Sequence, residues 1–503
     1  MRPSGSSTRL VIFVVLGAAL LLNTTFGEVT QVGRGLGWDG RTYANIVQRW
    51  VESPRTILYT YSYYTSHRVL PSVLVGTAFR LFRVVPSPQN VISGFHWYNL
   101  GVLMAALWLW LRLTAHMRFS PPLTWLTTIL VFVTFPVQKQ YMFFPVTTDT
   151  TGFLVGVGLA FGVARRQQWI ILAAAVLGAL SWPPGMYAGA LLLVLPSSPV
   201  EDPARPPYFG AALITVATMT LSLYAAYWAK VLPIGWINAT FLPLTLAISG
   251  ALLLGGSLRL LPSAGPVLAE GLRIFRGWRF YVAAALLLGL RAVLARFSAP
   301  GGPPIGNEIL QMSFNHLRAP GVSFLANAVY LGPVIVLALY LWKKIGRIVR
   351  SYGLGALTVA VLYFGEMHLD SESRKAIIAL PFLGLFVGQA LLDARVRWRH
   401  VAMTAAACLL ASKVWVVVNT KGVPATEILL YPLQLLFSSI GPYMTNASYA
   451  VQAAAVLLLI MAAPLVWPVP FPFRRANRAP RPDTEAMPFL KTSGVAAPKR
   501  NAP

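Results

Sequence analysis

Charged residues and cysteine are both scarce in this sequence. Only 11% of its 503 residues are charged, whereas an average soluble domain is about 25% charged. The single cysteine, Cys408, excludes an intrachain disulfide, and because it lies in an apolar run we expect it to pack in the core. So little charge argues against a chain whose main solvent is water.

Apolar residues make up 56% of the chain, and its mean hydropathy is +0.62. Runs of about 17 to 25 apolar residues, the length that crosses a hydrocarbon core of ~30 Å as a helix, recur from Leu10 to Val466 with no soluble domain between them. A chain in lipid has to satisfy its backbone hydrogen bonds within each segment. The sequence therefore predicts an all-α, polytopic transmembrane helical bundle.

The net charge of +26 comes from basic residues in short clusters between the apolar runs, not from one face or arm that would bind nucleic acid. Interpreted as topology signals, these clusters give a transmembrane domain over residues 1–469 with about 12 to 14 spans and both chain ends in the cytoplasm. The expected spans are about 9–26, 91–111, 121–136, 145–164, 168–181, 185–197, 208–229, 239–258, 280–296, 321–342, 353–367, 376–392, 401–418 and 449–468.

Three segments depart from the simple span-and-loop pattern. Residues 27–90 form a long external loop, in which 69–85 lies along the membrane interface. A Trp-Pro-Pro-Gly sequence at 182–185 divides 168–197 into two short helices, which form either two spans or one re-entrant hairpin. The tail 470–503 is basic and poor in apolar residues, so we expect a disordered cytoplasmic extension.

This topology gathers the polar residues on the non-cytoplasmic side of the membrane. An ionised group within a span costs about 2.5–3.5 kcal/mol and is a functional candidate by default. Arg291, in the outer third of its span, is therefore a candidate for contact with an anion. Nine of the 15 carboxylates are expected to be external: Glu28, Asp39, Glu52, Asp149, Glu308, Glu366, Asp370, Glu372 and Glu427.

The first external loop contains a candidate general base. Asp39 lies between Gly37 and Gly40, which permit a tight turn and leave the carboxylate uncovered. An ordinary Asp-Gly turn explains the same pattern equally well. Farther along the loop an aromatic cluster is either a membrane-interface belt or a platform for a sugar or isoprenoid chain. That cluster comprises Tyr59, Tyr61, Tyr63 and Tyr64, followed by His67 and Arg68.

Two further polar groups stand at the outer ends of spans. Asp149 follows two threonines, so it is either a second site carboxylate or a helix N-cap. The turn 366–375 carries more charge than a short connection needs. Its histidine and carboxylates could hold a divalent cation, or Arg374 could clamp a phosphate while a carboxylate orients it. The charged or ionisable residues of this turn are Glu366, His368, Asp370, Glu372, Arg374 and Lys375.

In combination, these short motifs resemble the bacterial GT-C-type glycosyltransferases that use polyprenyl-phosphate-linked sugars. The likeness is carried by anchors scattered over the chain. They are Trp38-Asp39-Gly40 in the first external loop, Arg68-Val69-Leu70-Pro71, Thr148-Asp149-Thr150 and Glu372-Ser373-Arg374 before Leu380-Pro381. The first loop lacks the second acidic residue found beside the catalytic one in some metal-dependent members, so the use of Mg²⁺ or Mn²⁺ stays open.

The resemblance implies a GT-C-like fold and an inverting transfer of sugar to a glycan, lipid or protein acceptor. The protein would be a multi-pass component of the bacterial cytoplasmic (inner) membrane, with its active site on the external face. Asp39 and Asp149 would be the catalytic residues, with Asp39 as general base on the acceptor hydroxyl. The donor phosphate or sugar would be bound by Arg68, His67, Arg291, His368, Asp370, Glu372 and Arg374.

Two other classes of protein remain open from the sequence. A lipid-linked oligosaccharide flippase or other transporter would have a similar number of helices, but its polar groups should lie at mid-membrane and along both halves. A polysaccharide polymerase or ligase would use the same kind of donor and rely on Arg and His in late external loops.

Overall fold

The computed structural model describes residues 5–37, 39–57, 60–201, 207–230, 237–261, 277–299, 312–417, 444 and 446–469. Within these ranges every regular element is a helix, and the only β-type pairing is an isolated bridge between Ser62 and Ala299. The predicted all-α class is confirmed. Trp38, the expected cytoplasmic tail 470–503 and most of the expected external loop 419–447 lie outside the described residues.

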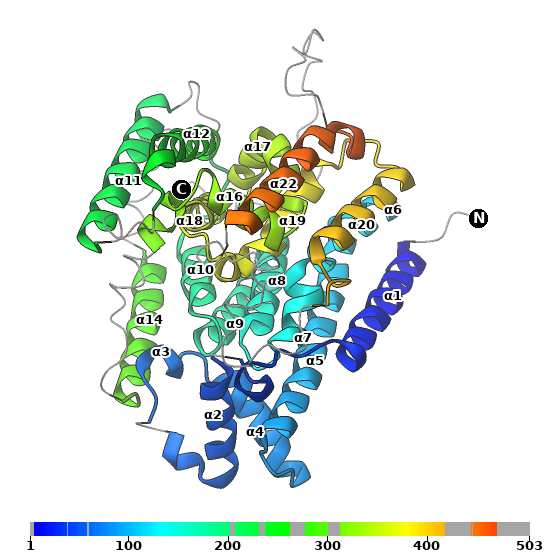
Figure 1. The fold of residues 1–503 in the computed structure, drawn as a ribbon, viewed down its shortest axis with the longest axis vertical. Coiled ribbons are helices and arrows are strands. Elements are labelled where there is room, and N and C mark those ends of the chain that lie inside the picture. Colours follow the sequence, from blue (N-terminus) through cyan, green and yellow to red (C-terminus); the bar gives the residue numbers. More distant parts are fainter. Residues whose placement is uncertain are drawn as a thin grey trace, which may run out of the picture. The chain divides into compact units, whose positions relative to one another are not determined.

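Five helices are long and apolar enough to cross a membrane, which fits the expected multi-pass protein. One of them, α5, begins at a proline after Ser87, whose side chain accepts a hydrogen bond from the Asn90 amide and caps the helix. The five are α1 (Gly5–Phe26), α5 (Pro88–His116), α11 (Tyr208–Trp228), α12 (Leu242–Leu260) with the 3-10 turn η4 (Ala239–Phe241), and α22 (Asn446–Val466), all visible in Figure 1.

Two further apolar segments are helices broken in the middle. The first joins α6 (Pro121–Phe132) to the π-helix η3 (Pro136–Gln140) and α7 (Tyr141–Phe143), with a bend of 60°. The second joins α16 (Val322–Tyr330) to α17 (Val334–Ser351), with a bend of 112°. Proline lies in each break, as Pro136 and Pro333, and removes a backbone donor there.

By length and composition, the described residues thus contain five spans, or seven if each broken pair is one span, fewer than the 12 to 14 expected. The difference arises because several apolar runs fold into shorter helices, such as α18 (Leu354–Leu369). For residues 168–197 the sequence allows two spans or one re-entrant hairpin. The structure has two helices there, α9 (Gln168–Ala179) and α10 (Pro183–Val194), of 12 residues each. Each is about 18 Å long, too short for a core of ~30 Å, so the re-entrant hairpin fits better.

The remaining helices complete the chain between these elements. The segment expected along the interface is α4 (Leu70–Phe82), which packs against α2. The others are α2 (Gly40–Glu52), α3 (Tyr63–Ser66), α8 (Asp149–Arg165), α14 (Trp278–Arg296), α19 (Ala379–Ala390) and α20 (Trp398–Ser412), with the 3-10 turns η1 (Val32–Gly35), η2 (Pro54–Ile57), η5 (Asn315–Leu317) and η6 (Ser373–Ile378).

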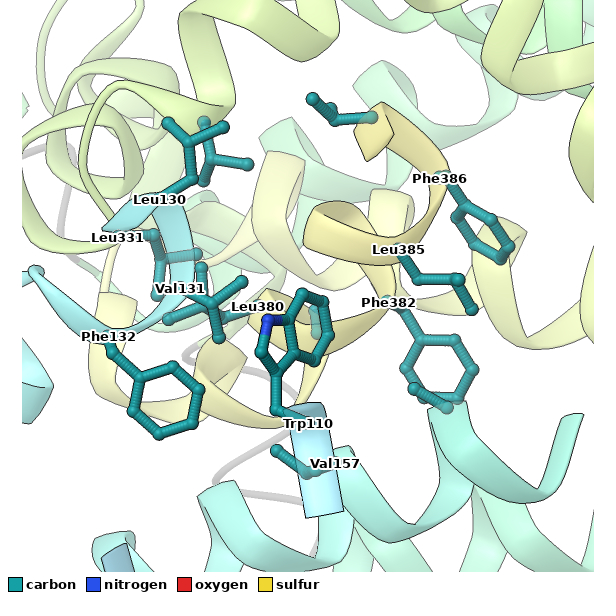
Figure 2. Close-up of a cluster of buried hydrophobic side chains, with 14 of the residues drawn as sticks. Trp110, Leu130, Val131, Phe132, Val157, Leu331, Leu380, Phe382, Leu385 and Phe386 are labelled. Atoms are coloured by element: carbon teal, nitrogen blue, oxygen red, sulfur yellow. The ribbon is translucent and has the colours of Figure 1, made fainter. Parts of the chain in front are cut away.

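One large cluster of buried apolar side chains joins the central helices α5, α6, α8, α16, α17 and α19. Figure 2 shows part of it, with Trp110 of α5 among side chains of α6, α8 and α19. A glycine, Gly384, lets α19 approach Val131 and Trp110 closely. Cys408 is fully buried in the same cluster, as expected. A second, smaller cluster packs α2 and α4 onto the start of α5 through residues such as Val47, Phe79 and Phe95.

Candidate functional site

Two glycines bring the first loop, α8 and η6 close together. Gly40 lies against the segment before α8, and a Cβ atom there would be 3.0 Å from the Val146 carbonyl oxygen. Gly156 of α8 lies against η6, and its Cβ atom would be 2.6 Å from the Ile378 carbonyl oxygen. Any larger side chain would push these segments apart. The close approach therefore places Asp39, Asp149 and the 370–375 turn in one region.

Asp39 uses its side chain for a contact across the chain rather than for a local turn. It directly precedes α2, yet its carboxylate makes no capping hydrogen bond to that helix. Instead, Oδ2 of Asp39 accepts a hydrogen bond from Nη1 of Arg374 at 3.0 Å, across 335 residues of sequence. The two side chains are 47% and 30% exposed, so this contact is reachable from solvent.

Arg374 belongs to a chain of alternating charges in the 370–375 turn. Its Nε donates to Oε1 of Glu372 at 2.7 Å, and Lys375 reaches both Glu372, at 2.9 Å, and Asp370, at 3.0 Å. Asp370 is 2% exposed and also accepts from Nδ2 of Asn315 at 2.7 Å and from the Glu372 amide at 2.9 Å. Because its contacts are so complete, Asp370 holds the turn in place and leaves Arg374 to face outward.

The charges in this turn stabilise one another. Burial raises the pKa of Glu372, but Arg374 and Lys375 more than compensate and hold it below its ordinary value. Burial lowers the pKa of Arg374, yet Glu372, Asp149 and Asp39 together raise it well above its ordinary value. Both groups therefore stay ionised at neutral pH, and Arg374 is a permanent cation at the exposed end of the network.

Asp149 is not a helix cap. The N-cap of α8 is Thr148, and no side chain makes a capping hydrogen bond there. The Asp149 carboxylate is 6% exposed and interacts electrostatically with Arg374, Arg68 and Asp39. Its Oδ1 has no hydrogen-bond partner among the described residues. A buried polar atom without a partner costs about 1–3 kcal/mol, so the position is not explained by stability of the helix start.

Arg68 lies beside the same carboxylates in an aromatic setting. Its guanidinium stacks over the rings of Tyr64, at 4.2 Å, and Trp182, at 5.2 Å, and interacts electrostatically with the Tyr43 hydroxyl. Burial lowers the pKa of Arg68, but Tyr43 and Tyr64 outweigh it and raise the pKa. Tyr43 and Trp182 were not identified from the sequence. Tyr43 follows Asp39 by four residues, the spacing that places two side chains on one helix face, and this signal could have identified it.

His67 and Arg291 lie at the edge of the site rather than in the charge network. Nδ1 of His67 lies 3.0 Å from the Ala179 carbonyl oxygen and the ring meets Tyr63 edge-on, so His67 ties the loop to the α9–α10 turn. Burial lowers the pKa of His67 and keeps it neutral. Arg291 of α14 is exposed, and its recorded electrostatic neighbours are Tyr63 and His67. Neither residue forms an ion pair with Asp39 or Asp149 among the described residues.

His368 faces away from the charge network. Its ring stacks on Phe364 and lies 5.8 Å from the ring of His316. It also lines a mainly apolar groove of about 460 Å³ between α12, α17, α18 and α19. His368 is therefore not part of the same site as Asp370 and Glu372, although the three residues are close in sequence.

The donor set offers little to a metal ion. Within the described ranges no three His, Cys, Asp or Glu side chains are grouped to hold one, and Glu372 and Asp370 are already paired with cations. The residues that converge are Asp39, Asp149, Arg68, Glu372 and Arg374, with Asp370 and Lys375 behind them. Such a set can bind an anion and accept a proton.

Comparisons with known proteins do not narrow the assignment. No protein-family model matches the sequence, and no curated protein or solved structure shows significant similarity to it.

Proposed function

We propose that the protein is a GT-C-type membrane glycosyltransferase that transfers a sugar from a polyprenyl-phosphate donor to an acceptor on the external face of the bacterial cytoplasmic membrane. The observation that carries the proposal is the ion pair between Asp39 and Arg374, with Asp149 and Arg68 within electrostatic range. A carboxylate and a permanent cation, held together yet reachable from solvent, supply a base and a phosphate site at one place.

In the proposed reaction, Asp39 accepts the proton of the acceptor hydroxyl as the acceptor oxygen bonds to the anomeric carbon. The bond from that carbon to the phosphate oxygen breaks, and its electron pair leaves with the phosphate. Attack opposite the leaving phosphate inverts the anomeric configuration. Arg374 and Arg68 stabilise the negative charge that develops on the phosphate. No step runs through a metal ion.

Arg374 has donors to spare for the phosphate. A guanidinium carries five N–H donors in a fixed fork, and here Nε and Nη1 contact Glu372 and Asp39. A phosphate that draws Arg374 toward itself weakens the contact with Asp39. The base is then released at the moment the donor is bound, which favours donor binding before the acceptor.

The groove beside His368 is suited to the donor's lipid chain. Its lining residues on α17 extend from Ile335 to Val349, which corresponds to about 21 Å of helix at 1.5 Å per residue. Most of the lining is apolar, including Phe364 and Phe386. His368 lines the groove and stands two residues before Asp370 in the sequence. In the proposal, an isoprenoid chain lies in the groove while its phosphate reaches Arg374.

The test is sugar transfer from labelled polyprenyl-phosphate donors by protein in nanodiscs. Asp39→Asn keeps the size of the side chain but removes the charge, so turnover should fall by about 10²–10⁴-fold, the usual cost of losing a general base, while donor binding persists. Asp393→Asn is the matched control, because Asp393 is an exposed carboxylate paired with Lys344 outside the site. Unchanged turnover in Asp39→Asn would remove this residue from catalysis.

A transporter of lipid-linked sugars is the second candidate. Broken helices occur at the substrate sites of secondary transporters, and the pairs α6–α7 and α16–α17 have this character. Under this alternative, no donor would be consumed by the unmodified protein, whereas a labelled lipid-linked sugar would cross the bilayer of proteoliposomes. The two assays therefore separate the candidates.

A further inference from the structure

The two broken helices meet next to the charge network. The ring of Phe135, in the first break, lies 5.5 Å from the ring of Tyr330, the last residue of α16. A Cβ atom on Gly332, in the second break, would lie 3.5 Å from the Thr134 side chain. Figure 2 shows Phe132 and Leu331, which border the two breaks, on the same side of the buried cluster. Breaks of this kind free backbone and side chains from regular packing and are frequent at functional sites.

Two buried polar side chains, one from each broken helix, lie close to each other near Asp149. Gln140 ends the π-helix η3 and is 6% exposed, and Tyr330 is fully buried. The Tyr330 hydroxyl lies beside the Gln140 side chain and interacts electrostatically with Asp149, Arg374 and Glu372. Three chain segments, starting at residues 136, 149 and 322, thus contribute to one buried polar cluster within electrostatic range of Arg374.

This cluster contains polar atoms that the described part of the protein leaves without a well-formed hydrogen bond. They are Oδ1 of Asp149, Oε1 of Gln140 and Oη of Tyr330. Buried polar atoms in folded proteins nearly always have partners, so each exception calls for an explanation. The Gln140 amide oxygen can only accept hydrogen bonds, and so can the Asp149 carboxylate oxygen while that group is ionised. The Tyr330 hydroxyl can donate or accept.

We propose that Asp149, Gln140 and Tyr330 form a recognition subsite for the hydroxyl groups of a sugar. A ligand that supplies several O–H donors at short spacing matches a group of acceptors, and a polyol does so better than an amine or a carboxylate. The placement of this sugar on a lipid phosphate at Arg374 rests on the proposed function; its recognition by the three side chains does not.

Arg374 is a charged neighbour of the subsite. The three oxygen atoms are shielded from solvent, and Arg374, which is 30% exposed, interacts electrostatically with both Asp149 and Tyr330. When Arg374 turns toward a phosphate, the sugar next to that phosphate gains access to these oxygens. Recognition of the hydroxyls then follows recognition of the phosphate.

The experiment measures equilibrium binding, in nanodiscs, of farnesyl-phosphate-linked hexoses and pentoses together with their mono-deoxy analogues. The unmodified protein should prefer one hydroxylated probe over the matching deoxy probe. In Tyr330→Phe that preference should fall by about tenfold or more, the size of one hydrogen bond to a polar ligand group, while affinity for the deoxy probe changes little. Gln140→Leu should reduce the preference for a hydroxyl in the same way.

Thermal unfolding separates recognition from a structural role. Tyr330→Phe removes a hydroxyl that makes no well-formed hydrogen bond among the described residues. The melting temperature should therefore stay the same or rise, whereas removal of a structural hydroxyl would lower it. Tyr352→Phe is the control, because Tyr352 lies at the far end of α17 and its hydroxyl is hydrogen-bonded to Gln389. This control should lose stability and keep the preference.

Four results are decisive. If Tyr330→Phe and Gln140→Leu keep the preference for the hydroxylated probe and sugar transfer is intact, the proposed subsite is wrong and the proposed glycosyltransferase function stands. A reduced preference without any transfer by the unmodified protein keeps the subsite and overturns the enzyme. Equal binding of hydroxylated and deoxy probes by the unmodified protein overturns the subsite, and failure to bind any probe overturns both proposals.

Discussion

Replacement of Arg374 with Gln is the sharpest test of the phosphate site, because its cost to folding can be bounded. The change removes the contacts with Asp39, at 3.0 Å, and Glu372, at 2.7 Å. The first pair is half-exposed and contributes about 0–1 kcal/mol. The second is a more buried charge-assisted bond of about 1.5–3 kcal/mol, but Lys375 still neutralises Glu372. We expect a loss of about 1.5–4 kcal/mol, which is less than the stability of about 5–15 kcal/mol that is typical of folded proteins.

The effect on donor binding should be larger in relative terms. Each charge-assisted hydrogen bond to a phosphate oxygen contributes about 1.5–3 kcal/mol, so the loss of one weakens affinity by about 10- to 150-fold and the loss of two by more. Arg374→Lys keeps the charge but not the fork of donors. It should therefore recover part of the affinity for the donor. It should recover a smaller part of the turnover, because a lysine cannot hold Asp39 and the phosphate in fixed positions at the same time, as the guanidinium group can.

The assay is binding of a polyprenyl-phosphate sugar and, separately, of the polyprenyl phosphate alone, in nanodiscs. Arg347→Gln serves as control, since Arg347 is an exposed cation on α17 outside the charge network. Both ligands should lose affinity in Arg374→Gln and neither in Arg347→Gln. If Arg374→Gln binds both ligands as tightly as the unmodified protein, the phosphate lies elsewhere and the assignment of this residue is wrong.

Three further predictions concern the surroundings of the site. Lys375→Met leaves the buried Asp370 carboxylate without its cation, so the free energy of unfolding should fall by about 3–5 kcal/mol, measured by denaturation in detergent. Because the pKa of Glu372 is held below 4.5, its stabilisation is complete above that pH and lost below it; Glu372→Gln should flatten the decline in melting temperature as the pH falls below about 5. His67→Ala removes a 3.0 Å contact with Ala179 and should lower stability by about 1 kcal/mol, with donor affinity changed less than in Arg374→Gln.

The site residues that could be predicted from the sequence are charged residues near the ends of apolar segments, where charge is rare. Asp39, Asp149 and Arg374 stand out because an ionised group near a membrane needs a reason to be there. Their convergence could be expected from a shared membrane face, and the structure places Asp39 against Arg374. The all-helical class follows just as directly, since lipid leaves the backbone few alternatives.

Other features depend on packing that a single sequence does not reveal. Tyr330 lies inside an expected span, 321–342, and Gln140 lies in the short connection between the expected spans 121–136 and 145–164. Neither therefore stands out as a site residue, and only Pro136 and Pro333 hint at the breaks in the helices. His368 packs on Phe364, four residues earlier on the same face of α18, whereas Asp370 and Glu372 lie beyond the end of that helix. Among the described residues the candidate spans are fewer than the sequence predicted, for a related reason. Hydropathy measures apolar length, whereas α9 and α10 fold back on each other after 12 residues.

The 335 residues between Asp39 and Arg374 also have a consequence for biosynthesis. At about 5–20 residues per second, a ribosome needs about 17–67 s to reach Arg374 after it has made Asp39. During that time the Asp39 carboxylate lacks the cation with which it pairs in the folded protein. The site is therefore completed only when a late segment inserts. A chain that stops before residue 374 would carry Asp39 and Arg68 but not Arg374, so the proposed phosphate site would stay incomplete until most of the helices have been made.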